Sequence, residues 1–152
     1  MPGASFRFRL ERVRAVRERR ESLAKQELAK SITRLSSSEA ELRHADCDLE
    51  QARAEQRDVA QTTGPVGAAE LLARQAFLER VEAERRLRAV ELVRSEAEVK
   101  ERNATLVTAA SEHEMLKRLR ERRRGEYDRE LARVERNVLD EIATVRHGRL
   151  SA

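Results

Sequence analysis

The chain has 152 residues, of which 39% are charged and only 3% aromatic, and its formal net charge is +4. So few large apolar side chains argue against a compact globular core, whereas abundant Ala, Glu, Arg and Leu are typical of a coiled coil or a long helix. Disorder is the alternative for so polar a chain, but its apolar residues recur at helical spacing, which favours folded helices.

The first predicted element is a helix over about residues 5–61, with Ser5 as its N-cap. Steps of four and three separate its first apolar residues, which are Phe6, Leu10, Val13 and Val16. The clearest row has strict heptad spacing and consists of Leu28, Leu35, Leu42 and Leu49. A companion row contains Ala45, Ala52 and Val59, preceded by Ser31 and Ser38, where we expect a thin seam. This narrow stripe is typical of a coiled coil.

Residues 62–67 interrupt the apolar pattern and are the predicted loop. Pro65 removes an interior helical hydrogen bond, and Gly64 and Gly67 permit a tight turn. The second predicted helix covers about residues 68–147. Its heptad row consists of Leu71, Leu78, Leu92, Val99 and Leu106, with Arg85 at one position, and the predicted parallel row consists of Ala83, Val90, Ala97 and Ala104.

A further apolar row closes the second helix and consists of Tyr127, Leu131, Val134, Val138, Ile142 and Val145. A short loop between two long helices favours antiparallel pairing. We therefore predict an all-α protein, a single antiparallel coiled-coil hairpin over residues 1–152, whose second helix is longer and overhangs the first.

Charge is unevenly distributed along the two predicted helices. Residues 1–20 hold seven basic and two acidic residues, residues 117–136 hold nine and five, and residues 31–58 hold four and seven. The predicted hairpin brings both basic stretches to the end where the chain termini meet. A basic end favours an acidic protein partner. We expect no nucleic-acid partner, because acidic residues interleave with the arginines and no zinc-finger, helix-turn-helix or aromatic RNA-binding pattern occurs.

Catalytic, metal and membrane motifs are missing from the sequence. It holds no Gly-rich phosphate loop, no metalloprotease motif and no paired cysteines, so we expect no enzyme activity, cofactor or metal site. His44 and Cys47 share a helix face, but two ligands do not make a zinc site. No apolar run approaches the roughly 18 residues of a membrane span, and no signal peptide is evident. With its single cysteine, the chain is expected in the cytoplasm.

Two stretches of the chain resemble the flagellar export protein FliJ family. One is FRFRLERV at residues 6–13 with the amphipathic run that follows it. The other is LKRL at 116–119 with Tyr127, Leu131, Arg133, Glu135 and LDE at 139–141, which is similar to that family's C-terminal pattern. The two-helix plan and the length also agree over nearly the whole chain.

The resemblance implies a component of the flagellar type III protein export apparatus. Members of the family are antiparallel coiled coils that resemble the central stalk of rotary ATPases. The resemblance implies three partners: the ring of the export ATPase, which the stalk activates, the export gate protein FlhA, and export chaperones, which it escorts. It implies a peripheral position at the inner face of the cell membrane, reached through these partners.

Carried over residue by residue, the resemblance and the basic end give candidate contacts. The ATPase-binding candidates are Arg7, Arg9, Arg12, Arg14, Arg118, Arg122, Arg123, Arg129 and Arg133. The export-gate candidates are Phe77 and Val81, where this chain has fewer aromatic residues than the family pattern. Two alternatives stay open at this point: the stalk of a virulence type III secretion system, and a coiled-coil scaffold without an ATPase partner.

Overall fold

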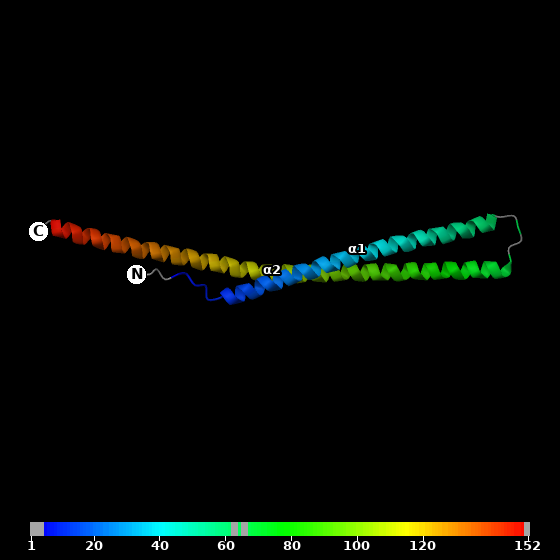
Figure 1. The fold of residues 1–152 in the computed structure, drawn as a ribbon, viewed down its shortest axis with the longest axis horizontal. Helices are drawn as coiled ribbons and strands as arrows, with labels where there is room; N and C mark the ends of the chain where they lie inside the picture. Colours follow the sequence, from blue (N-terminus) through cyan, green and yellow to red (C-terminus); the bar gives the residue numbers. More distant parts are fainter. Residues whose placement is uncertain (1–4, 62–63, 65–66, 151–152) are drawn as a thin grey trace. The chain divides into compact units, whose positions relative to one another are not determined.

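The protein consists of two antiparallel helices in the computed structural model, which describes residues 5–61, 64 and 67–150. Helix α1 covers Glu11–Gln61 and helix α2 covers Ala68–Leu150. The two ribbons run in opposite directions and lie side by side (Figure 1). With 83 residues, α2 is longer than α1 with 51. The predicted all-α hairpin with a longer second helix is therefore confirmed.

The break between the helices agrees with the sequence pattern. Helix α1 ends at Gln61 and α2 begins at Ala68. The backbone N–H groups of Glu70 and Leu71 donate to the carbonyl oxygen of Gly67 at 3.0 and 3.1 Å, which closes the first turn of α2. The rest of the predicted loop, including Pro65, lies outside the described residues apart from Gly64.

Contacts along the helices divide the chain into two units. The terminal unit is Met1–Ser22 with Thr108–Ala152, and the loop unit is Leu23–Val107. Each unit holds a piece of α1 against a piece of α2, and each is described below by itself. That the whole chain forms one domain stays a prediction.

The most buried part of the seam in the loop unit is a row of mostly small α1 residues. The side chains buried there are those of Ala24, Ser31, Ala45, Leu49 and Ala52. Ser31 is only 1% exposed, whereas Leu28, Leu35 and Leu42 of the leucine row are half-buried. Small residues let the two backbones approach, so the larger leucines pack beside the line of closest contact.

The two serines do not thin the seam, contrary to expectation. The Ser31 hydroxyl donates to the carbonyl oxygen of Leu28 at 2.8 Å, so its burial leaves no unpaired donor. The Ser38 and Ser95 hydroxyl oxygens lie 2.9 Å apart and form a hydrogen bond between the helices. Serine at this row therefore satisfies its polar group and still permits close packing.

One predicted row of α2 was wrong. Ala83, Val90, Ala97 and Ala104 are exposed, with Val90 57% accessible. They follow the heptad row of Leu78 by five residues, which is about 140° around a helix, whereas a companion row requires an offset of three or four. The half-buried companion row observed consists of Arg74, Val81, Arg88, Ser95 and Arg102.

Arginines of the seam reach carboxylates on the opposite helix. Arg85 Nε lies 2.8 Å from Asp46 Oδ1, and Arg88 Nη1 lies 2.7 Å from Glu41 Oε2. Arg34 and Glu98 pair at 2.7 Å in the same way. Each partly exposed pair contributes little energy. Together they oppose a shift in register, because sliding one helix would separate all of them.

Helix α1 begins later than predicted. It starts at Glu11, and residues 5–8 before it are not helical, so Ser5 is not its N-cap. The Glu11 N–H donates to the carbonyl oxygen of Phe8 at 3.1 Å, and Glu11 places a negative charge at the positive end of the helix dipole. Phe6, Phe8 and Leu10 alternate with arginines, a period of two that favours an extended segment.

Enlarging a small seam residue tests the close approach of the helices. Ala45 is 4% exposed, so Ala45→Leu should overpack the seam and lower the free energy of unfolding by about 1–3 kcal/mol. Urea unfolding followed by far-UV circular dichroism would measure it. Ala40→Leu, at an exposed position of α1, is the control and should change stability little. Equal effects of the two substitutions would contradict the packing described here.

Candidate functional site

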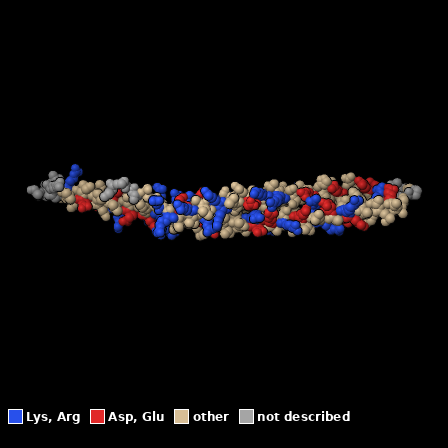
Figure 2. Space-filling view, turned by 60° about the horizontal axis from the view of Figure 1, so that its bottom comes forward, with Lys and Arg blue, Asp and Glu red and all other residues tan. Residues whose placement is uncertain are grey.

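Positive charge is concentrated in the terminal unit. Its sequence holds 18 Lys and Arg against 12 Asp and Glu, a formal charge of +6, whereas the loop unit holds 14 against 16, a formal charge of −2. Figure 2 shows blue side chains gathered over the surface where α1 begins. The candidate binding site is therefore the surface of the terminal unit.

The segment before α1 packs on α2 through two aromatic rings. The ring centroids of Phe6 and Tyr127 are 5.8 Å apart, with the planes tilted by 49°. This geometry is typical of a favourable aromatic pair. Beside it lies an open groove of about 700 Å³ that Leu10, Leu119 and Arg123 also line. The pair holds Arg7 and Arg9, which flank Phe8, close to α2.

Ion pairs connect α1 to α2 across the terminal unit. Arg120 Nε lies 3.4 Å from Glu11, and Arg17 pairs with Glu112. His113 Nδ1 lies 2.6 Å from Glu21, with both side chains largely buried at 16% and 17% exposure. These contacts place the basic start of α1 beside the basic stretch of α2, as the sequence predicted for an antiparallel pair.

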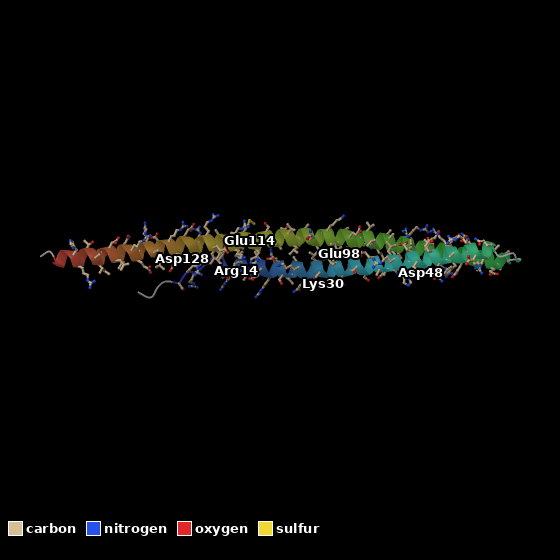
Figure 3. The ribbon with its side chains drawn as sticks, turned by 90° about the horizontal axis from the view of Figure 1, so that it is seen from above. Arg14, Lys30, Asp48, Glu98, Glu114 and Asp128 are labelled. Atoms are coloured by element: carbon tan, nitrogen blue, oxygen red, sulfur yellow. The ribbon has the colours of Figure 1, made fainter. Side chains whose placement is uncertain are left out.

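Arg14 forms ion pairs with carboxylates of its own helix, α1. Arg14 lies near the start of α1 (Figure 3). Its guanidinium contacts Glu11 at 2.7 Å and Glu18 at 3.3 Å. The hydrogen bond from Arg14, assisted by the positive charges of Arg14 and Arg120, lowers the pKa of the Glu11 carboxyl. The same hydrogen bond raises the pKa of Arg14. An arginine held by two carboxylates presents less charge to a partner than its formal charge implies.

Four other predicted arginines also have partners on α2. Glu114 pairs with Arg118, Glu126 with Arg123 and Glu130 with Arg133, each at 3.0 Å. Arg129 donates to the carbonyl oxygen of Gly125 at 3.1 Å. These side chains remain exposed and lie one helical turn from their partners. Such pairs are weak and separate readily when a stronger partner arrives.

The remaining predicted arginines are Arg7, Arg9, Arg12 and Arg122, and all four are exposed. No carboxylate of the described residues forms an ion pair with any of them. Their charges are therefore available to a partner without breaking an internal contact. Sequence alone could not separate these four from the other five, because the separation depends on which rotamers reach a carboxylate.

An exposed apolar strip lies among these arginines. Val13 and Val16 on α1 are 44% and 49% exposed. They line a shallow groove together with Arg12, Arg17 and Arg20. The sequence pattern predicts a continuous apolar face that contains both valines and Phe6, but in the structure both valines lie inside α1 and are exposed. Apolar side chains framed by arginine are a common composition of protein interfaces.

The two predicted export-gate residues differ in accessibility. Phe77 is 47% exposed on α2 of the loop unit. Val81 belongs to the half-buried companion row that faces α1. Phe77 is thus the more accessible of the two to a partner, and whether either residue contacts the gate stays a prediction.

The described residues offer little to a metal ion or a membrane. His44 Nδ1 lies 2.9 Å from Asp48, and Cys47 is exposed. Within residues 5–61, 64 and 67–150, no group of three or more His, Cys, Asp or Glu side chains is placed to hold a metal ion. Neither helix, over its described residues, contains a stretch apolar and long enough to span a membrane.

Comparison with known proteins gives one match. The family model for the flagellar FliJ protein matches residues 6–151, nearly the whole chain. Searches of the curated proteins and of the solved structures each found no significant match.

The single tyrosine offers a direct test of the aromatic pair. The chain has one Tyr and no Trp, so its intrinsic fluorescence reports on Tyr127 alone. Phe6→Ala should release residues 5–10 from α2 and make Tyr127 more accessible to acrylamide quenching. Phe77→Ala in the loop unit is the control and should leave quenching unchanged. Unchanged quenching in Phe6→Ala would mean that Phe6 does not cover Tyr127 in solution.

Proposed function

Because the chain belongs to the FliJ family of flagellar proteins, we propose that it serves the flagellar export apparatus as the non-catalytic stalk of its ATPase. In this proposal the terminal unit enters the ring of the export ATPase, promotes ring assembly and stimulates ATP hydrolysis. The observation that carries it is the set of exposed arginines without internal partners, Arg7, Arg9, Arg12 and Arg122, in a unit of formal charge +6.

Electrostatics and packing support an acidic protein partner for the terminal unit. Unpaired arginines raise the rate of encounter with an acidic surface. Each planar guanidinium group can also donate two parallel hydrogen bonds to one carboxylate. Val13 and Val16 add exposed apolar area beside them. An acidic ring with apolar patches would bury these valines and pair these arginines.

The same proposal assigns the loop unit to the other partners. Export chaperones and the export gate protein FlhA would bind there, with Phe77 as the leading contact because its ring is exposed. Such contacts would keep the protein in the cytoplasm, at the inner face of the membrane, without a segment of its own in the bilayer. The family match favours this flagellar role over a stalk of a virulence secretion system.

The first experiment is a binding and activity assay with the export ATPase of the same genome. Purified ATPase would be assayed for ring formation and hydrolysis with and without this protein, at low and at moderate salt. Stimulated hydrolysis and ring assembly would support the stalk. The absence of binding and of stimulation at both salt concentrations would favour a scaffold without an ATPase partner.

Charge reversal tests which part of the protein contacts the export ATPase. The triple variant Arg7→Glu, Arg9→Glu, Arg122→Glu should lose ATPase binding by at least about tenfold, because it repels an acidic partner and breaks no internal pair. The control is the triple variant Arg57→Glu, Arg80→Glu, Arg94→Glu, which has the same charge change in the loop unit and should bind as the unaltered protein does. If both triple variants lost ATPase binding equally, net charge and not the position of these arginines would account for the loss.

A second substitution separates the gate contact from the ATPase contact. Phe77→Ser should weaken binding to the cytoplasmic part of the gate protein while ATPase stimulation stays unchanged, since it removes an exposed ring from the loop unit. Leu72→Ser is the matched control, because Leu72 is 71% exposed and lies on a different face of α2. Binding measured by calorimetry would decide, and undiminished affinity of Phe77→Ser would exclude this ring from the contact.

A further inference from the structure

An apolar stripe of α2 in the terminal unit has no partner in the described chain. It consists of Leu131, Val134, Val138, Ile142 and Val145, which are 42%, 49%, 49%, 52% and 52% exposed. The stripe continues the face on which half-buried Tyr127 contacts Phe6, one turn beyond it. Figure 3 shows α2 continuing past Asp128 without a second helix beside it.

The spacing of the stripe is the same when read from either end. The steps between its residues are three, four, four and three, so Val138 is its centre of symmetry. If a second copy of the helix is laid antiparallel with the two Val138 side chains together, Leu131 meets Val145 and Val134 meets Ile142. From this symmetry we propose that two copies of the protein pair antiparallel through this stripe.

Charges beside the stripe favour the same orientation. Asp128 and Arg146 are eighteen residues apart, about five turns of helix, so they lie on the same flank of the stripe. Antiparallel pairing brings Asp128 of one copy near Arg146 of the other, twice per dimer. Parallel pairing in register would instead place the two copies of each residue on opposite sides of the dimer, so Asp128 would not meet Arg146. The existing contact of Asp128 with Arg124, at 3.7 Å, is long and exposed and does not prevent this exchange.

The carboxylates nearest the centre do not oppose the dimer. Glu135 and Glu141 are six residues apart and lie on opposite flanks of the stripe, about 120° apart around the helix. In a twofold antiparallel pair each flank meets the same flank of the other copy. Glu135 therefore faces the neighbourhood of Leu139, and Glu141 that of Asn137, so like charges stay apart.

Mass in solution tests the pairing. With rising concentration, sedimentation equilibrium should show a shift from 17.5 kDa towards twice that mass. Val138→Glu places two carboxylates together at the twofold axis and should keep the protein monomeric at every concentration. Ala143→Glu adds the same charge outside the stripe and should dimerise as the unaltered protein does. An unaltered protein that stays monomeric, or a Val138→Glu variant that still dimerises, would overturn the proposal.

Disulfide trapping tests the orientation in a Cys47→Ser background, because Cys47 is exposed and would cross-link by itself. A disulfide needs Cβ atoms about 3.5–4.5 Å apart. Val138→Cys should cross-link with itself, and Leu131→Cys should cross-link with Val145→Cys when the two variants are mixed. Leu131→Cys alone should not cross-link. Efficient cross-linking of Leu131→Cys alone would show a parallel pair and would overturn the antiparallel assignment.

Discussion

Close approach of α1 and α2 along the small-residue row determines the architecture of the loop unit. Ala24, Ser31, Ser38, Ala45 and Ala52 repeat every seven residues, and all but the half-buried Ser38 are buried. Their size brings the backbones together, so leucines pack to either side and arginine stems of α2 cover the gaps. Because little apolar area is fully buried, register depends on polar contacts such as Arg85 with Asp46 and Ser38 with Ser95.

The elements of the fold that follow from local spacing were predictable. Strict heptads from Leu28 to Leu49 and the break around Gly64 gave two helices and their antiparallel pairing. How deeply each row is buried was less predictable. Leucine and serine occupy adjacent rows of α1, and which row lies closer to α2 depends on how the two helices pack. Ser31 was expected to weaken the seam, yet it is the most buried side chain described.

Two errors share a physical origin in periodicity. The row that begins at Ala83 lies five residues after the row of Leu78, which rotates it away from α1. The step of four from Phe6 to Leu10 predicts a helix, but the alternation of apolar residues with arginine favours the extended chain that places Phe6 against Tyr127. At the candidate binding surface, the sequence predicts a basic unit but not which of its arginines are paired, since that depends on side-chain rotamers such as that of Arg14 between Glu11 and Glu18.

The distribution of burial also has a dynamic consequence. Among the described residues, the most deeply buried side chains all belong to the loop unit, while the terminal unit is held by the tilted pair of aromatic rings, ion pairs and half-buried residues such as Leu116. Regions with few buried apolar contacts open locally at lower free energy. The backbone amides of the terminal unit should therefore exchange with solvent sooner than those around Ala45. A partner that binds this unit would slow the exchange of these amides. Part of the binding free energy would then offset the conformational entropy that the unit loses on becoming ordered.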